Sequence, residues 1–219
     1  MKRREFIALL GGAAMWPVPA RAQQAGKTYK IGWLSAGSFE RSPAPAAFLD
    51  ALRELGWIEG KTFAFERRSA ENRPERLPEL AAELVQLNVD VIVGVATLAP
   101  LAAKRATTTI PIIMTNAGDP LETGLVDSLA RPGGNVTGMS LMAPDIAGKR
   151  LEQLKELLPR LARVSVLWNA ANPYSALVFK RVQAASGTLG IEVQSLECDS
   201  LMISMAHSKL CDGSTLMHL

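Results

Sequence analysis

The chain of 219 residues has only two histidines and two cysteines, and all four lie after residue 197. General acid–base chemistry relies most often on histidine, and thiol nucleophiles require a cysteine, so residues 1–197 offer neither group. The four side chains themselves are Cys198, His207, Cys211 and His218, and their spacing matches no familiar zinc pattern. We therefore expect no catalytic residues, no metal and no cofactor.

A net positive charge is also missing from most of the chain. Residues 1–22 combine a basic start (residues 2–4), a short apolar run (residues 6–15) and an Ala-Arg-Ala cleavage pattern at residues 20–22, which together predict an export signal peptide. The remaining chain holds 20 basic and 20 acidic residues, because the signal contains four of the 24 basic and one of the 21 acidic residues. This balance argues against nucleic-acid binding. Arg3 and Arg4 suit the twin-arginine route, and the general secretory route remains open.

What the chain does contain is a repeated alternation of strand and helix patterns. Strands are expected at residues 30–34, 63–65, 89–95, 110–114 and 136–140, with helices between most of them. Such an alternation predicts a parallel sheet covered by helices on both faces.

A second, shorter unit with the same pattern begins near residue 141. A helix is expected from Pro144, a strand at residues 164–168, another helix from Asn172 and Pro173, and a strand at residues 191–196. After Glu197 no clear strand and no well-capped helix can be recognised. We therefore expect residues 198–219 to be an atypical, disordered tail.

Residues 110–140 are the most informative stretch. A buried strand at residues 110–114 is followed by a polar loop at residues 115–118, and Asp119, Pro120 and Glu122 then form a capping-box pattern that predicts a short helix. That helix would end before residues 131–134. A strand end followed by a helix N-terminus is where α/β sheets bind ligands.

Candidate ligand-binding residues lie where the predicted strands end. They are Ser35, Ser38, Thr97, Asn116, Asp119, Ser140 and Asn169. Hydroxyl and amide groups suit a carboxylate, and Asp119 suits an ammonium group, so the set favours an amino acid or a similar zwitterion. A role as helix N-cap explains Asp119 equally well.

Several phrases of the sequence resemble one protein family. They lie at residues 76–81, 107–112, 118–120, 129–138, 148–151 and 166–169. They resemble the substrate-binding proteins of ABC importers with a type I periplasmic-binding fold, in the branch that includes tryptophan and phenylalanine binders. The resemblance runs from about residue 30 to about residue 197.

The resemblance implies a periplasmic solute-binding protein, with a Rossmann-like parallel-sheet lobe followed by an incomplete second α/β lobe. We expect a signal peptide at 1–22, a linker at 23–29, the first lobe at 30–140, a partial second lobe at 141–197 and the tail at 198–219.

The family binds a small ligand between its lobes and docks on a permease in the inner membrane. Because the resemblance stops near residue 197, we expect a truncated second lobe, impaired binding, and a monomer that aggregates through an unpaired strand edge. The alternatives are a periplasmic flavodoxin-like enzyme and a non-functional fragment.

Overall fold

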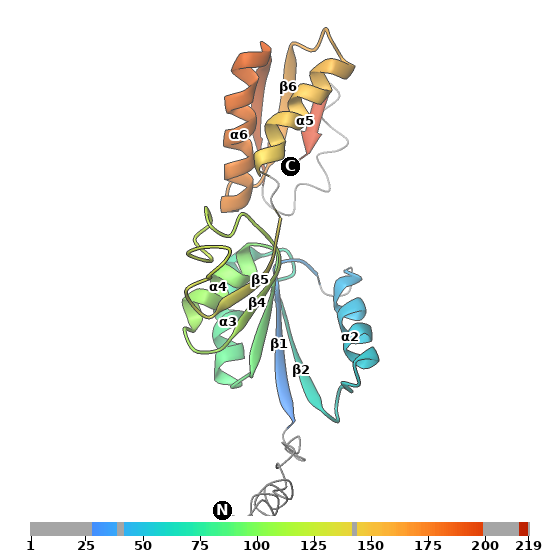
Figure 1. The fold of residues 1–219 in the computed structure, drawn as a ribbon, viewed down its shortest axis with the longest axis vertical. Coiled ribbons are helices and arrows are strands. Elements are labelled where there is room, and N and C mark those ends of the chain that lie inside the picture. Colours follow the sequence, from blue (N-terminus) through green and yellow to red (C-terminus); the bar gives the residue numbers. More distant parts are fainter. Residues whose placement is uncertain (1–27, 39–41, 142–143, 199–214, 219) are drawn as a thin grey trace, which may run out of the picture.

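The computed structural model describes residues 28–38, 42–141, 144–198 and 215–218. They form two α/β lobes, stacked along the long axis of the molecule (Figure 1). Lobe 1 comprises the described residues up to Leu141, and lobe 2 those from Pro144 onward. The predicted signal peptide lies outside the described residues. Across the described ranges, the structure contains no helix with the length and apolar character that a membrane span requires.

Lobe 1 is built on a parallel sheet of five strands in the order β2-β1-β3-β4-β5. In chain order its elements are β1 (Tyr29–Ser35), α2 (Ala44–Glu54), β2 (Phe63–Ser69), the 3-10 helix η2 (Pro74–Arg76), α3 (Leu77–Gln86), β3 (Val91–Val95), α4 (Leu98–Ala106), β4 (Ile112–Gly118) and β5 (Val136–Leu141). The prediction of a parallel α/β sheet is confirmed.

The main core of lobe 1 lies between the sheet and the helices α3 and α4, which cover the same face (Figure 1). Leu77, Leu80 and Leu84 recur at helical spacing on α3 and are buried there. Gly94 lets α4 approach β3 closely, since a Cβ at this position would lie 2.8 Å from the backbone nitrogen of Pro100. This close approach places the N-terminus of α4 at the end of the strands.

Helix α2 covers the opposite face of the sheet, as predicted (Figure 1). Its Phe48 ring lies 5.5 Å from the ring of Trp33 on β1 and 6.1 Å from that of Phe65 on β2. On this face burial extends to Val93 on β3, which is 1 % exposed, and ends before β4. Ile113 on β4, in the same register row as Trp33, is 40 % exposed.

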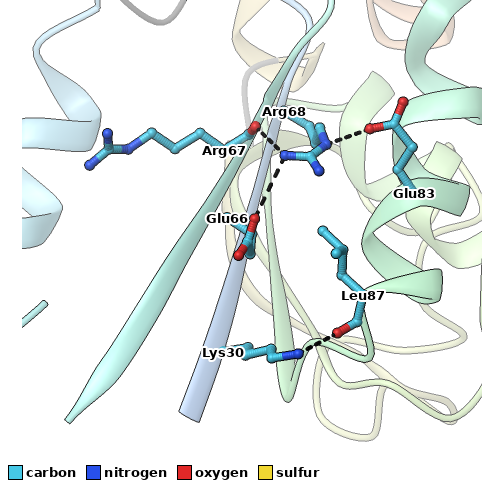
Figure 2. A network of polar contacts seen from close by, with 6 residues as sticks. All are labelled: Lys30, Glu66, Arg67, Arg68, Glu83 and Leu87. Carbon is cyan, nitrogen blue, oxygen red and sulfur yellow. Dashed lines mark hydrogen bonds and ion pairs between the residues drawn. The ribbon is translucent and has the colours of Figure 1, made fainter. Parts of the chain in front are cut away.

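A polar network joins α3 to the sheet at the β1–β2 side (Figure 2). The Arg68 guanidinium lies 2.6 Å from the Glu83 carboxylate and 3.8 Å from that of Glu66. Lys30 donates from Nζ to the carbonyl oxygen of Leu87 at 2.9 Å. Because these groups remain partly exposed, each pair contributes at most about 1 kcal/mol.

Two predictions within residues 110–131 are wrong. Residues 115–118 are not a loop but the end of β4, which runs through an irregularity between Met114 and Ala117. The short helix predicted after Asp119 is a series of turns. Its first turn closes through the carbonyl of Asp119, which accepts from the N–H of Thr123 at 3.0 Å. The helix goes no further because Gly124 has φ +74°, and the carbonyl of Pro120 then accepts from both Leu125 and Val126.

Lobe 2 contains a three-stranded parallel sheet in the order β7-β6-β8. Its elements are α5 (Pro144–Leu157), β6 (Arg163–Trp168), α6 (Pro173–Leu189), β7 (Glu192–Glu197) and β8 (Thr215–His218). Leu151 of α5 and Val182 of α6 pack with Val164 and Val166 of β6 in one small core. Gly190, with φ +61°, ends α6 in the left-handed conformation that glycine favours.

Strand β8 corrects the prediction that residues 198–219 contain no strand. Residues 215–218 pair with β6 from Val164 to Leu167, so β6 is the central strand and β7 is an edge. A sequence pattern of four residues is too short to indicate a strand by itself, and its pairing with β6 is what defines it. Residues 199–214 and residue 219, which were also predicted to be disordered, lie outside the described residues.

Candidate functional site

The carboxyl ends of β1, β2 and β3 open onto one hollow between the two lobes. Its volume is about 160 Å³, and it is lined by Ala36, Gly37, Asn72, Pro74, Val95, Ala96, Leu98, Asn169 and Asn172. The last two residues belong to the loop between β6 and α6 in lobe 2, and the others belong to lobe 1. A ligand in this hollow would therefore contact both lobes.

A larger hollow adjoins the first and shares four of its lining residues, Asn72, Pro74, Leu98 and Asn169. Its volume is about 560 Å³, and Leu77, Leu101 and Ala102 give it a largely apolar wall. Arg73, Glu75 and Arg105 supply charged groups along the same lining. The asparagines of the first hollow, and the leucines and charged groups of the second, together suit a small ligand with a charged end and an apolar side chain.

The loops around the first hollow hold several residues in left-handed backbone conformations. Asn72 has φ +62° and Ala96 has φ +59°, and Asn116 (φ +53°) lies near the end of the neighbouring strand β4. Asparagine adopts this region readily, whereas alanine does so rarely. Such conformations persist where the surrounding structure holds them, and they are common at ligand sites. At Ala96 the holding bond is its own N–H, which donates to the carbonyl of Thr115 at 2.9 Å.

The N-terminus of α4 lies beside these hollows. Thr97 occupies the N-cap position, but its side chain makes no capping bond, because Oγ1 accepts from the N–H of Gly118 at 3.0 Å. Because Pro100 has no N–H, the first turn of α4 offers the N–H groups of Leu98 and Ala99, which have no side-chain cap, and Leu98 lines both hollows. Uncapped N–H groups and the helix dipole favour an anionic group here.

Lobe 2 presents two asparagines from the opposite side. Asn172 caps α6, since its Oδ1 accepts from the N–H of Tyr174 at 3.1 Å. Asn169 uses its Oδ1 to accept from the N–H of Ala171 at 2.9 Å. Because its side-chain oxygen is engaged within the loop, the NH₂ group of Asn169 is the part that can donate to a ligand.

The structure places Asn169, Ser35, Thr97 and Ser38 at or beside the hollows. Asn169 lines both of them. Ser35 and Thr97 precede lining residues but are buried, and their hydroxyls are engaged within lobe 1, where Ser35 Oγ donates to the carbonyl of Gly37 at 3.1 Å. Ser38 follows Gly37 and is half-buried.

The other three predicted site residues, Asn116, Asp119 and Ser140, belong to the β4–β5 side of lobe 1 and do not line either hollow. Asn116 is exposed at the irregularity of β4, and Ser140 is half-buried opposite Ala117. Asp119 accepts from the N–H of Glu122 at 3.1 Å, so one carboxylate oxygen stabilises the following turn.

Tyr174, in the first turn of α6, lies against Gly118 at the end of β4. Burial raises the pKa of its phenol above the usual 10.0, with Arg150 lowering it and Asp119 raising it further. The ring contacts Gly118, where a Cβ would overlap it. The side chain thus links α6 of lobe 2 to the end of β4 in lobe 1.

Sequence reasoning missed Asn72, Pro74 and Leu98. Residues 71–73 form a polar loop directly after β2, which is the same pattern that identified the other strand ends, and in the sequence Pro74 indicated only a helix start. The lining by Ala36 and Ala96 has no side-chain signal in the sequence, because alanine carries only a methyl group. Among the described residues, no group of three or more His, Cys, Asp or Glu side chains could hold a metal ion.

Comparison with known proteins finds one matching family and several similar proteins. Residues 42–212 match the family model described as "ABC transporter substrate binding protein". A curated tyrosine-binding protein of Clostridioides difficile is 36 % identical over 135 residues, which is 61 % of this chain and 38 % of that protein.

Solved structures show the same architecture. A conserved domain protein from Vibrio cholerae has a TM-score of 0.74 and 30 % identity, over 86 % of this chain and 64 % of that one. A Streptococcus pneumonia ABC domain in complex with L-Trp has a TM-score of 0.68 and 25 % identity, over 82 % and 63 % of the two chains. This chain therefore spans less than two thirds of the length of these relatives.

Proposed function

Because the chain belongs to the ABC transporter substrate binding protein family, we propose that it binds an amino acid or a similar small zwitterion between its two lobes. The family has the type I periplasmic-binding fold, and its members bind solutes rather than catalyse reactions. Membership therefore disfavours the alternative of a flavodoxin-like enzyme.

One observation carries this proposal. Asn169 of lobe 2 and the strand-end loops of lobe 1 line a common hollow, so a small molecule there would be held from both sides. The NH₂ group of Asn169 and the first-turn N–H groups of α4 are donors that suit a carboxylate. The further roles predicted for Ser35, Ser38, Thr97, Asn116, Asp119 and Ser140 remain proposals. Asp119 is the candidate for an ammonium group.

The wall of the larger hollow favours a bulky apolar side chain on the ligand. Leu77, Leu98 and Leu101 supply much of that wall, and a volume of about 560 Å³ admits an aromatic ring. The names of two relatives, one a tyrosine-binding protein and one solved with L-Trp, support an aromatic amino acid.

The wider role is part of the same proposal. Family membership supports an extracytoplasmic importer component that closes around its ligand and docks on a membrane permease. Export by the twin-arginine or general secretory route is proposed from the pattern of residues 1–22. The impaired binding expected from the sequence remains part of this proposal.

Calorimetric titration of the purified chain tests the ligand class. We expect L-tyrosine and L-tryptophan to bind with 1:1 stoichiometry, L-leucine more weakly, and L-serine and L-glutamate least, because only bulky apolar side chains fill the larger hollow. Benzoate separates recognition of the carboxylate from recognition of the ammonium group. Equal binding of serine and tryptophan would overturn the aromatic assignment, and absence of binding by every compound would favour the non-functional alternative.

A single substitution tests the site itself. Asn169→Asp keeps the oxygen that accepts from Ala171 but replaces the NH₂ donor with a negative charge. We expect binding of L-tyrosine to weaken by about ten-fold or more, since loss of a donor and repulsion of the carboxylate act together. Asn88→Asp is the matched control, because Asn88 is exposed in the turn that leads into β3, at the opposite end of that strand. Equal affinities of the two variants would exclude Asn169 from the site.

A further inference from the structure

A contact between the lobes lies beside the point where the chain passes from one to the other. Gly118 ends β4 and pairs in register with Leu141, the last residue of β5. The next residue, Asp119, donates its N–H to the carbonyl of Leu141 at 3.2 Å. From lobe 2, the ring of Tyr174 lies directly over Gly118.

Gly118 is required for this contact by geometry. A Cβ built on Gly118 would overlap the Cγ, Cδ2 and Cε2 atoms of the Tyr174 ring, so any other residue would displace the ring. The backbone of Gly118 cannot move away freely, because its N–H donates to Thr97 Oγ1 at 3.0 Å and both residues are buried.

Tyr174 is equally well fixed on lobe 2. It lies in the first turn of α6, and its N–H donates to the cap oxygen of Asn172. The charged groups that act on its phenol come from both lobes, Asp119 from lobe 1 and Arg150 on α5 from lobe 2. A rigid ring that is anchored through its backbone in α6 and packed on Gly118 can transmit the orientation of one lobe to the other.

We propose that Tyr174 is a positioning residue that sets the angle between the lobes, with Gly118 as its contact surface on lobe 1. The ring restrains the two lobes beside Gly118 and Leu141, where β4 and β5 end. With the lobes held there, the loops that carry Asn169 and Ala96 face one another. This role extends the proposed binding function. It concerns the lobe angle of the ligand-free chain, which can be measured whether or not the proposed binding function is correct.

Loss of the contact lets the lobes sample wider angles. A smaller fraction of molecules then has the binding-competent geometry, and the apparent affinity falls by that fraction. An aromatic contact of this kind corresponds to an affinity loss of about three- to ten-fold.

Distance measurement between spin labels on the ligand-free chain tests the proposal directly. Glu79 on α3 and Ala184 on α6 are exposed and serve as cysteine positions in a chain carrying Cys198→Ser and Cys211→Ser. We compare Gly118→Ala, Tyr174→Ala and Tyr174→Phe with Gly148→Ala. The last is the matched control, because a Cβ at Gly148 would lie 3.2 Å from Ala185 between α5 and α6, within lobe 2.

We expect Gly118→Ala and Tyr174→Ala to broaden and lengthen the distance distribution, while Tyr174→Phe and Gly148→Ala retain it. Unchanged distributions for Gly118→Ala and Tyr174→Ala, with circular dichroism confirming folded proteins, would overturn the proposal. If Tyr174→Ala fails to fold, Gly118→Ala alone decides the matter.

Titration with L-tyrosine distinguishes this inference from the proposed function. A changed distance distribution in a protein that binds no tested amino acid would support the positioning role and contradict the proposed function. Tight binding with unchanged distances and unchanged affinity in Gly118→Ala would support the function and contradict the positioning role.

Discussion

The two lobes use the same βα unit but differ in the number of strands that are paired on both sides. In lobe 1, three strands (β1, β3 and β4) have a neighbour on each side, whereas in lobe 2 only β6 does. The core of lobe 1 draws on α3, α4 and residues of the β4–β5 connection, and that of lobe 2 rests mainly on α5, α6 and β6. Because a small core buries less apolar surface, lobe 2 has the smaller margin of stability.

The outer strand of lobe 2 also differs in character from the buried strands. Strand β7 forms one edge of its sheet, and its Glu192, Gln194 and Glu197 are exposed. Charged edge strands resist pairing with other chains. Aggregation through this edge remains a prediction, and the edge in question carries charges that oppose it.

The largest contrast should come from equivalent core truncations in the two lobes. Leu84→Ala in α3 and Leu151→Ala in α5 each remove a fully buried side chain, and each should reduce the free energy of unfolding by about 2–5 kcal/mol. Hydrogen exchange should show that Leu151→Ala increases exchange in lobe 2 alone, since lobe 1 has its own core. Uniformly increased exchange in both lobes would show that they unfold as one unit.

A smaller effect is expected where a single hydrogen bond joins the N-cap residue of α4 to the last residue of β4. Thr97→Val removes the acceptor of the Gly118 N–H, which is buried, and should lower the free energy of unfolding by about 1–3 kcal/mol. Thr137→Val on β5 is the control, because Thr137 is exposed, and should change it by less than about 0.5 kcal/mol. Equal urea midpoints for the two variants would contradict the structural role of Thr97.

The free energy of unfolding should depend on pH in the alkaline range, because Tyr174 lies in the contact between the lobes. The folded-state pKa of Tyr174 is raised above 10.0 by burial, so the protonated phenol is favoured in the folded protein. The contribution of the protonated Tyr174 phenol to the free energy of unfolding is therefore fully present below pH 10, and it is lost as the pH rises through the folded-state pKa. Urea denaturation between pH 8 and pH 11 should show a smaller decline in Tyr174→Phe than in the unsubstituted chain, and identical declines would contradict this assignment.

The smallest change in the free energy of unfolding is expected for the polar network at the β1–β2 side of lobe 1. Glu83→Gln weakens the 2.6 Å pair with Arg68 and should change the free energy of unfolding by less than about 1 kcal/mol, since both side chains are partly exposed. Added salt should reduce the difference between the variant and the unsubstituted chain. A loss well above this size would show that the network in Figure 2 is more strongly coupled than its exposure indicates.

Local patterns were sufficient to predict most elements, and they failed where long-range contacts decide the conformation. The cap and proline before α6 predicted its start, and the structure shows the bond from Tyr174 N–H to Asn172. The same pattern at Asp119 and Pro120 predicted a helix that does not form. Asp119 does accept from Glu122, but the left-handed Gly124 ends the turn after a few residues.

The binding hollow illustrates the second limit. The rule that strand ends meet at one edge brought Ser35, Thr97 and Asn116 into consideration, but it does not say which side chains point inward or which are already bonded. In the structure Thr97 bonds Gly118, whereas Asn72 lines both hollows. A linear pattern cannot distinguish these two outcomes, because the difference lies in partners more than twenty residues away in the chain.

The sequence by itself determined the βα alternation and the parallel sheet, because hydrophobic period and capping residues act over a few neighbouring positions. It also indicated the family, through the resemblance of several of its phrases to the family's own. Tertiary structure alone decided three further features. These are the pairing of β8 with β6, the left-handed loop at Ala96 and the contact of Tyr174 with Gly118. Each of them depends on atoms that are distant in sequence and meet only when the lobes are folded, and there packing and hydrogen bonds override local preference.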